Sequence, residues 1–316
     1  MAIPVLESSD SAASTGSASV TITKPTGLAV GDLLLVQLAA SDIGGDNRTW
    51  STPSGWTAVE VGGTTEEAVP AAYYIIATST ETAASNFTFS MSGTTTAISG
   101  VLMRISGHWG ASPITVSEID QTAGSTTSLT FTTALTPAIT NSLLIFSFMG
   151  AGNAFTSGTP TIASYASTPS ATWSEVADVG VKDGSDDGHG LGVAQADYSG
   201  LTQITSRTAT INQTANLDYA SIAIIVNGTV DANTTPTFVA STQSAFATTG
   251  SAGATTTLTL KTSDQTKFDP VGYGNSPPAF TNEAKQSTTF TNTAKQSTTY
   301  TNASKSSTTY TNQDKP

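Results

Sequence analysis

The sequence contains no cysteine, which excludes a disulfide framework, a thiolate metal site and cysteine nucleophile chemistry. It is also poor in charge, because only 11% of its 316 residues are charged. No apolar run reaches the about 18 residues that a membrane-spanning helix needs. Residues 1–10 lack the basic and apolar regions of a secretory signal. We therefore expect a protein that is made in the cytoplasm and has no membrane partner.

The polarity that charge does not supply comes from hydroxyl side chains, among them 59 threonines. Thr is β-branched and stiff at χ1, so it suits the solvent face of a pleated sheet. Long straight-chain helix formers at helical spacing are scarce. Short apolar segments alternate with turn sequences such as Lys24–Gly27 and Thr52–Gly55, which is typical of antiparallel sandwiches and barrels. The sequence therefore predicts an all-β fold.

The first 229 residues contain one series of strand-like segments twice in the same order. The runs Leu33–Val36 and Leu143–Phe148 are continuously apolar, so each is expected to form a central core strand. We predict two tandem antiparallel β-sandwich domains, jelly-roll or immunoglobulin-like, that derive from an internal duplication. Their predicted bounds are residues 1–110 and 111–229.

The C-terminal region is different in character. Residues 230–279 are expected to form an extended connector with one isolated strand at Thr255–Leu260. Residues 280–316 repeat the ten-residue unit aromatic-Thr-Asn-x-x-Lys-x-Ser-Thr-Thr. Ten residues suit one strand and one tight turn, so we expect a small meander, whose units stack on one another or on a partner because one unit cannot bury its aromatic alone. A flexible Thr/Ser-rich tail is the alternative. The aromatic residues predicted to bind partners are Phe280, Phe290, Tyr300 and Tyr310.

The net charge of −12 is distributed unevenly. Residues 280–316 carry four lysines against two acids, which gives +2, and the rest of the chain therefore carries −14. A part this acidic repels phosphate backbones, so we expect no nucleic-acid binding. The difference in sign predicts that the tail has a different partner from the rest of the chain.

Residues able to perform catalysis are few. His108 and His189 are the only histidines. His108 follows a predicted strand and is expected in a loop or at an edge, whereas His189 is expected in a flexible acidic loop. No Gly-x-Ser-x-Gly elbow marks a serine nucleophile. The sequence therefore predicts no enzymatic activity and no cofactor.

The acidic loop also resembles the opening of a calcium loop, because Asp183, Ser185 and Asp187 alternate before Gly188. The bidentate Glu expected at the twelfth position is replaced by Ala194. A tight connection between two strands needs Asp and Gly in any case. The pattern favours an ordinary turn and leaves a calcium site as the alternative.

The four tryptophans fall into two pairs. Trp56 and Trp173 occupy equivalent places in the two halves, each at the start of a predicted strand, which favours core packing. Trp50 and Trp109 lie in predicted loops and are the better candidates for exposed contacts. Exposed aromatics beside polar loops bind sugars or protein partners. The alternative is that these loops fold back to cover the ends of the sandwiches.

Residues 24–36, Lys-Pro-Thr-Gly-Leu-Ala-Val-Gly-Asp-Leu-Leu-Leu-Val, are followed by Thr-Pro-Ser-Gly-Trp-Thr at 52–57. These segments resemble β-sandwich segments of tailed-bacteriophage virion proteins. The ten-residue tail unit is similar to terminal repeats of phage structural proteins. The first resemblance covers the N-terminal third of the chain and, through the duplication, extends to residue 228. It implies no catalytic residues.

The resemblance implies a structural protein on the outside of a virion assembled in the host cytoplasm. A tail, baseplate or fibre position is preferred over capsid decoration, because linear repeats suit an elongated attachment. Expected partners are other virion proteins, further copies of this chain in a homo-oligomer and a host-surface glycan during host attachment. A carbohydrate-binding adhesin or lectin-like module is the alternative function. A hydrolase built on a sandwich is the third.

Overall fold

A computed structural model of the chain contains two compact units, which divide after Val230. We call residues 1–230 the body. The described residues consist almost entirely of strands and turns, which confirms the predicted all-β fold. They are residues 3–41, 48–63, 67–110, 112–124, 126–153, 155, 158–183, 185, 187–213, 216–228, 257–260, 279–282 and 300–302.

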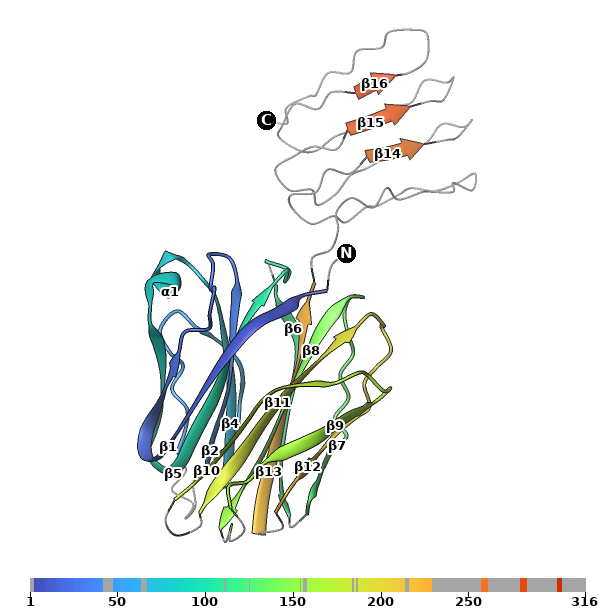
Figure 1. Cartoon of the computed structure of the whole chain (residues 1–316). Coiled ribbons are helices and arrows are strands. Elements are labelled where there is room, and N and C mark those ends of the chain that lie inside the picture. The colour runs from blue at the N-terminus through green and yellow to red at the C-terminus, as the bar shows by residue number, and fades with distance from the viewer. Residues whose placement is uncertain are drawn as a thin grey trace. The chain divides into compact units, whose positions relative to one another are not determined.

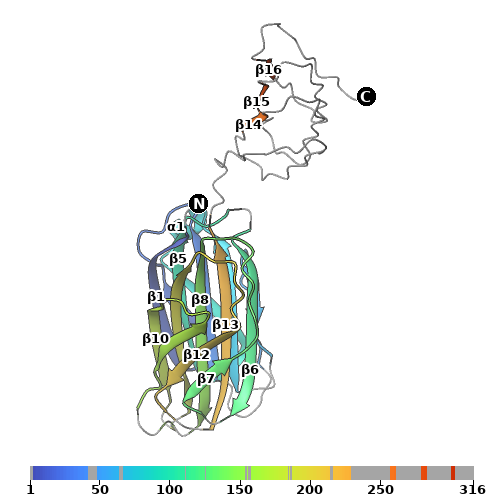
Figure 2. The ribbon, with the colours of Figure 1, turned by 90° about the vertical axis from the view of Figure 1, so that its right-hand side faces the viewer.

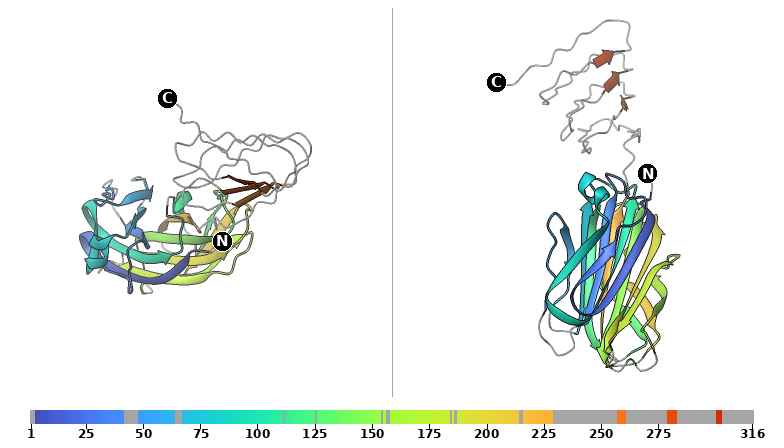
Figure 3. Two further views of the ribbon diagram at one scale, coloured as in Figure 1. Left: turned by 90° about the horizontal axis from the view of Figure 1, so that it is seen from above. Right: turned by 60° about the vertical axis from the view of Figure 1, so that its left-hand side comes forward.

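The first sheet of the body is antiparallel and has the strand order β1-β5-β2-β4-β3. The short helix α1 (Ser79–Ala83) connects β4 to β5, at the end of the body that also holds the N-terminus (Figures 1 and 3). Thr78 and Glu81 form a capping box at its start. Within the described part of the chain, no helix is long and apolar enough to cross a membrane. The strands of this sheet are β1 (Val5–Thr23), β2 (Leu33–Ser41), β3 (Thr57–Val61), β4 (Ala68–Ile76) and β5 (Asn86–Ser106).

Two further antiparallel sheets complete the body. The second sheet has the order β10-β11-β8-β13-β6, and the third has the order β7-β12-β9. Most of these strands run along one common direction (Figure 2). Their bounds are β6 (Ile114–Gly124), β7 (Ser128–Phe131), β8 (Ser142–Asn153), β9 (Ile162–Thr168), β10 (Ser174–Lys182), β11 (Gly188–Tyr198), β12 (Ser206–Ile211) and β13 (Asn216–Asn227).

The two five-stranded sheets pack face to face over one hydrophobic cluster, which we call the inner cluster. Leu33 and Leu35 of β2 enter this cluster, whereas Leu34 and Val36 enter a second cluster on the opposite face of the same sheet. The central strand β8 alternates in the same way between the inner cluster and a cluster beneath the third sheet. A strand buried on both faces needs apolar side chains at every position. The predicted central core strands are therefore confirmed.

The outer face of the first sheet is covered by the sheet's own longest strands. β1 and β5 pair along most of their length, but their register shifts between Ser17 and Ser19. Beyond the shift, Val20 of β1 lies opposite Phe89 of β5. Both are buried in the cluster on the face of the first sheet that is turned away from the inner cluster, which we call the outer cluster of this sheet. A register shift of this kind bends the strands, so the first sheet is strongly curled.

The two halves of the body share one strand order. Read from β1, the first sheet runs β1-β5-β2-β4-β3, and read from β6, the second runs β6-β13-β8-β11-β10. The register skips Val59 in β3 and Val176 in β10, so both halves have a bulge in the same edge strand. Where the sheets face each other, β1 lies near β10 and β3 lies near β6, which is a reciprocal arrangement. At the centre, the Ser147 hydroxyl on β8 donates to Gln37 Oε1 on β2 at 3.0 Å.

The second unit contains a parallel three-stranded sheet. Its strands are β14 (Thr257–Leu260), β15 (Ala279–Asn282) and β16 (Tyr300–Asn302), in that order. A strand is present where the connector was expected to contain one, and this strand, β14, pairs with β15. The expected meander is wrong for the described strands, because β15 pairs in parallel with the strand two repeats later.

Candidate functional site

The polar pair formed by His189 and Ser99 lies between the two five-stranded sheets. His189 Nε2 is 2.6 Å from Ser99 Oγ, and both side chains are completely buried. The expected position of His189 in a flexible loop is wrong, because β11 begins at Gly188 and pairs with β8 along its whole length. The distance suits a nucleophile and a base. Neither side chain meets solvent and His189 Nδ1 has no hydrogen-bond partner, so the pair lacks both substrate access and an orienting group.

Burial also determines the protonation state of His189. Desolvation in the inner cluster lowers the pKa of His189 to about 3, so the imidazole is neutral at physiological pH. The same positions in the other half of the body can be found by aligning the central strands β2 and β8. His189, which pairs with β8, then corresponds to Ala68, which pairs with β2. Ser99, which pairs with β2, corresponds to Ala220, which pairs with β8, and both alanines are in the inner cluster. The polar pair therefore occurs on one side of the body only.

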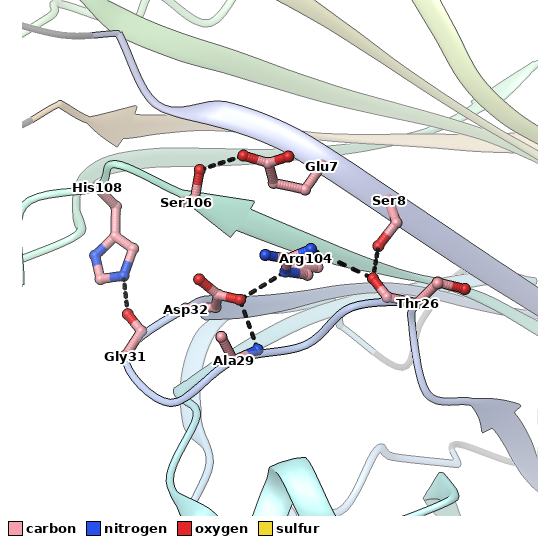
Figure 4. A network of polar contacts seen from close by, with 9 residues as sticks. All are labelled: Glu7, Ser8, Thr26, Ala29, Gly31, Asp32, Arg104, Ser106 and His108. Atoms are coloured by element: carbon pink, nitrogen blue, oxygen red, sulfur yellow. Dashed lines mark hydrogen bonds and ion pairs between the residues drawn. The ribbon is translucent and has the colours of Figure 1, made fainter.

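A second polar network surrounds the connection that leads into β2 (Figure 4). The Arg104 guanidinium on β5 donates through Nε to Asp32 Oδ2 at 2.6 Å, and the same oxygen accepts the Ala29 N–H at 2.8 Å. Thr26 O accepts the Ser8 hydroxyl at 2.8 Å and Arg104 Nη1 at 3.4 Å. These contacts attach the connection to β1 and β5, so the network has a structural role.

His108 lies beside this network, and its side chain is only 8% exposed. His108 Nε2 is 2.9 Å from the Gly31 carbonyl, which can only accept, so the proton is on Nε2 (Figure 4). His108 also forms a bridge with Gly228, the last described residue of the body. The expectation of a strand-end position holds, but the residue is buried and joins the segment after β5 to the segment after β13.

The most deeply buried charge is Arg207 on β12, whose side chain is fully inaccessible. Its Nη2 donates to Asp120 Oδ2 at 2.5 Å, and its Nε donates to Ser221 Oγ at 2.9 Å. Its Nη1 donates to the Thr133 carbonyl at 3.1 Å, and the guanidinium carbon lies 5.5 Å from the Phe131 ring centroid. The group joins the second and third sheets. Sequence reasoning missed it, although an arginine in an apolar, threonine-rich strand was an available signal.

One carboxyl group on the body has a strongly perturbed acidity. Asp178 on β10 is half-buried, and desolvation raises its pKa to about 6. The Ile162 N–H, 3.1 Å from Oδ1, opposes that shift, and the Glu175 charge adds to it. No histidine or hydroxyl nucleophile is among the partners recorded for Asp178. The position is therefore a titrating surface group of the fold.

The acidic loop has the contacts of a turn. Asp183 Oδ1 accepts the backbone N–H groups of Ser185 and Asp187 at 2.8 and 3.1 Å. The Ser185 hydroxyl donates to Asp183, and the Asp183 N–H donates to the Asp187 carbonyl at 2.8 Å. These bonds are the ones expected of the ordinary turn that the sequence favoured. In the described ranges, no group of three acidic or histidine side chains is placed to hold a metal.

The tryptophans differ from expectation in one case. The exposed position expected for Trp50 is wrong, because its side chain is 5% exposed and its Nε1–H donates to the Val69 carbonyl at 2.9 Å. Trp109 is half-buried, so it is the more exposed of the two tryptophans that were predicted to make contacts. Trp56 and Trp173 are half-buried. Trp56 packs against the outer cluster of the first sheet, and Trp173 packs against the cluster beneath the third sheet.

The predicted partner-binding aromatics of the tail are described in part. Phe280 on β15 and Tyr300 on β16 lie opposite each other in the parallel sheet. Leu258 of β14 lies opposite Phe280 on the other side. Phe290 and Tyr310 lie outside the described residues. The two described aromatics therefore belong to one ladder.

These sites have a common character. The polar side chains described above, at His189, Arg104, Arg207 and Asp183, form hydrogen bonds with other side chains or with the backbone of the body. The strand ladder of the second unit is the remaining candidate for an interaction. In comparisons with known proteins, no family model and no curated protein sequence matches this chain.

Proposed function

We propose that the chain is a non-enzymatic structural protein on the exterior of a tailed-phage virion, in the tail, baseplate or fibre in preference to the capsid surface. The observation that carries this proposal is the pairing of like strands. Phe280-Thr-Asn of β15 lies in register beside Tyr300-Thr-Asn of β16. A repeated strand that pairs with its own kind suits an assembly built from many identical copies. The partners are other virion proteins and further copies of this chain.

The body supports the same proposal through its chemistry. His189, Arg207 and Asp32 each form hydrogen bonds with other residues of the body. These chemically reactive side chains therefore stabilise the fold. The chain before residue 280 carries a strong negative charge, which disfavours contact with the packaged nucleic acid. An acidic all-β module followed by a repeat segment fits a part on the outside of a particle.

We infer that the body consists of two tandem sandwiches, residues 1–110 and 111–229, derived from one duplicated ancestor. The shared strand order, the equivalent bulges at Val59 and Val176 and the reciprocal facing of the edge strands support this inference. The bond between Gln37 and Ser147 supports it further, because these residues occupy equivalent positions at the centres of β2 and β8. Such self-pairing is expected where two copies pack about a two-fold axis.

The virion assignment is tested by electron microscopy of purified particles that carry a gold-binding tag after Pro316. We expect label at regular positions on the particle exterior. Mass spectrometry of the same particles serves as a control, because body peptides without label indicate that the tag was cleaved. Particles that contain neither label nor body peptides would overturn the proposal.

The alternative function as an adhesin relied on two loop aromatics, and Trp50 cannot contact a glycan because it is buried. Trp109 is the remaining loop aromatic for this function, because this residue is only half-buried. A glycan array probed with the full chain and with Trp109→Ala decides the matter. The adhesin function requires binding that the substitution abolishes, and an array without signal removes it.

A further inference from the structure

The strand β9 is held to the rest of the body by an interrupted set of contacts. It is the last strand of the third sheet and pairs with β12, but the register shifts between Thr208 and Thr210 of β12. Ser164 of β9 has a φ of 60°, in the left-handed region that favours glycine. Four of the seven residues of β9 are exposed. A strand with few buried residues and an interrupted ladder is of the kind that opens locally while the rest of a fold stays intact.

Two side chains of β9 attach it to the second sheet. Ile162 is fully buried, and the Tyr165 hydroxyl donates to the Ile162 carbonyl at 3.2 Å. Both side chains lie over Gly192 of β11, where a Cβ atom would collide with them. The Ile162 N–H donates to Asp178 Oδ1 on β10 at 3.1 Å. We call this contact of Ile162 and Tyr165 with the second sheet the β9 seam.

A bulge in β10 places two carboxyl groups at the β9 seam. Glu175 lies opposite Ala194 and Asp178 lies opposite Gly192, and the register passes over Val176 between them. Ala194 and Gly192 are two residues apart on β11, so they and their partners lie on one face of the sheet. In a regular strand, residues three apart point to opposite faces. The extra residue therefore brings Glu175 onto the face where Asp178 meets β9.

The described groups that face Asp178 come from three strands. Tyr165 is the only ionisable residue of β9, and burial and the charges of Glu175 and Asp178 raise its pKa, so the phenol is neutral. On β10, the other ionisable residues are Glu175 and Lys182, and Lys182 Nζ donates to the Phe155 carbonyl at 2.9 Å. The groups beside Asp178 are therefore a carboxylate and a phenol. The β11 residues on the same face are uncharged, namely Gly190, Gly192 and Ala194.

A second carboxylate between the same two sheets is balanced differently. Asp120 on β6 accepts a hydrogen bond at 2.5 Å from the buried guanidinium of Arg207 on β12. Asp178 has the Ile162 N–H in place of a cation. Burial raises the pKa of Asp178 to about 6, the Ile162 hydrogen bond opposes this rise, and the Glu175 charge adds to it. The third sheet is thus attached at β12 by an ion pair and at β9 by a carboxyl group that titrates.

We propose that the β9 seam is a pH-sensitive latch, which is held closed when Asp178 is protonated and opens locally when Asp178 is ionised. In the open seam Asp178 meets water and has its ordinary pKa of about 4, whereas its pKa in the closed seam is about 6. The stability that the protonated group contributes is fully present below about pH 4 and is lost as the pH rises through about 6. Arg207 keeps β12 attached meanwhile. This inference goes beyond the proposed function and does not rest on it.

The two pKa values set the size of the effect. Ionisation of Asp178 raises the opening equilibrium by up to about 100-fold, and by on the order of 20-fold between pH 4.5 and pH 7.5. Amide hydrogen exchange of the full chain, corrected for the intrinsic rate at each pH, measures this opening in residues 162–168. Relative to Asp178→Asn, which keeps an acceptor for the Ile162 N–H but does not titrate, the wild type should lose about 20-fold in protection. An equal pH dependence in both proteins would overturn the proposal.

Asp197→Asn is the matched control, because Asp197 is an exposed carboxylate on the neighbouring strand β11. This variant should show the wild-type loss of protection in residues 162–168. If the loss disappears in Asp197→Asn as well as in Asp178→Asn, the effect belongs to the total charge of the body and the latch is refuted.

The wild-type pH profile gives a readout that needs no variant. Protection of residues 162–168 should fall between about pH 4 and pH 6 and level off above about pH 7, where Asp178 is ionised in both states. A profile without a fall in this range contradicts the proposal.

A urea series separates local opening from unfolding of the whole body. Exchange through a local opening exposes little surface and depends weakly on urea, whereas exchange through global unfolding has the full urea dependence. Residues 162–168 should therefore respond little to urea below the unfolding transition, and residues 142–153 of the central strand β8 should follow global unfolding. Identical protection and urea dependence of the two segments would mean that β9 opens only when the body unfolds, and the proposal would fail.

Discussion

Acid should destabilise the body through His189 in a way that can be isolated. The folded-state pKa of His189 is about 3, and an unfolded histidine has a pKa of about 6.5. Between these two pH values, His189 is protonated in the unfolded chain and neutral in the folded chain. The stability that the neutral imidazole contributes is fully present above pH 6.5 and is lost as the pH falls from about 6.5 toward 3.

The size of the effect follows from the difference between the two pKa values. Each pH unit below the unfolded pKa costs about 1.4 kcal/mol until the folded pKa is reached. At pH 4.5 the loss attributable to His189 is therefore about 3 kcal/mol, and its limit near pH 3 is about 5 kcal/mol. These values are large against the about 5–15 kcal/mol that stabilises a typical domain.

The matched variant replaces the polar pair by apolar groups, His189→Leu together with Ser99→Ala. Changing both residues avoids a buried unpaired hydroxyl, which costs about 1–3 kcal/mol on its own. Urea unfolding at pH 7.5 and pH 4.5, followed by tryptophan fluorescence, gives the free energy of unfolding for both proteins. The wild type should lose about 3 kcal/mol more than the variant between the two pH values. Equal losses would refute a neutral, desolvated His189.

Three further changes test other parts of the body. Asp120→Asn should lower the free energy of unfolding by on the order of 3 kcal/mol, because the buried Arg207 loses its counter-charge. Urea titration measures this loss. A loss below about 0.5 kcal/mol, which is the level of a surface substitution, contradicts the prediction. Asp178→Asn should raise the melting temperature at pH 8, because the wild-type carboxylate is ionised there, above its raised pKa of about 6. The gain in melting temperature should vanish by pH 4, where the wild-type carboxyl group is protonated. A gain that is independent of pH excludes ionisation of Asp178 as its cause. Leu35→Ala should cost about 2–5 kcal/mol in the inner cluster, whereas the exposed Leu201→Ala should cost less than about 0.5 kcal/mol, and similar costs in urea unfolding would argue against the described core.

The parts of the fold that the sequence predicted are those in which local pattern and burial agree. The continuous apolar runs of β2 and β8 indicate strands covered on both faces, and both faces are covered. The high content of threonine predicts exposed strand faces in the same direct way. Period and composition suffice for such elements, because they need no knowledge of what lies across the sheet.

The failures concern residues whose environment is set by distant parts of the chain. His189 follows six acidic or turn-forming residues, so its local sequence indicates a loop. Its ring is nevertheless enclosed, because Ser99 lies across from it on another sheet. Trp50 has loop-like neighbours, but Met91 and Val69 hold it inside. The tail was predicted to pair consecutive repeats, because the period gives a strand and a turn but does not reveal the sense of the pairing.

The inner cluster has one more consequence. Because its side chains come from both five-stranded sheets, neither half retains a complete interior when the other is lost. A protease that cuts within one half should therefore release the whole body to degradation, instead of leaving a resistant fragment of about half its mass. The shared interior thus makes the body one cooperative unit, in which damage to either five-stranded sheet destabilises both.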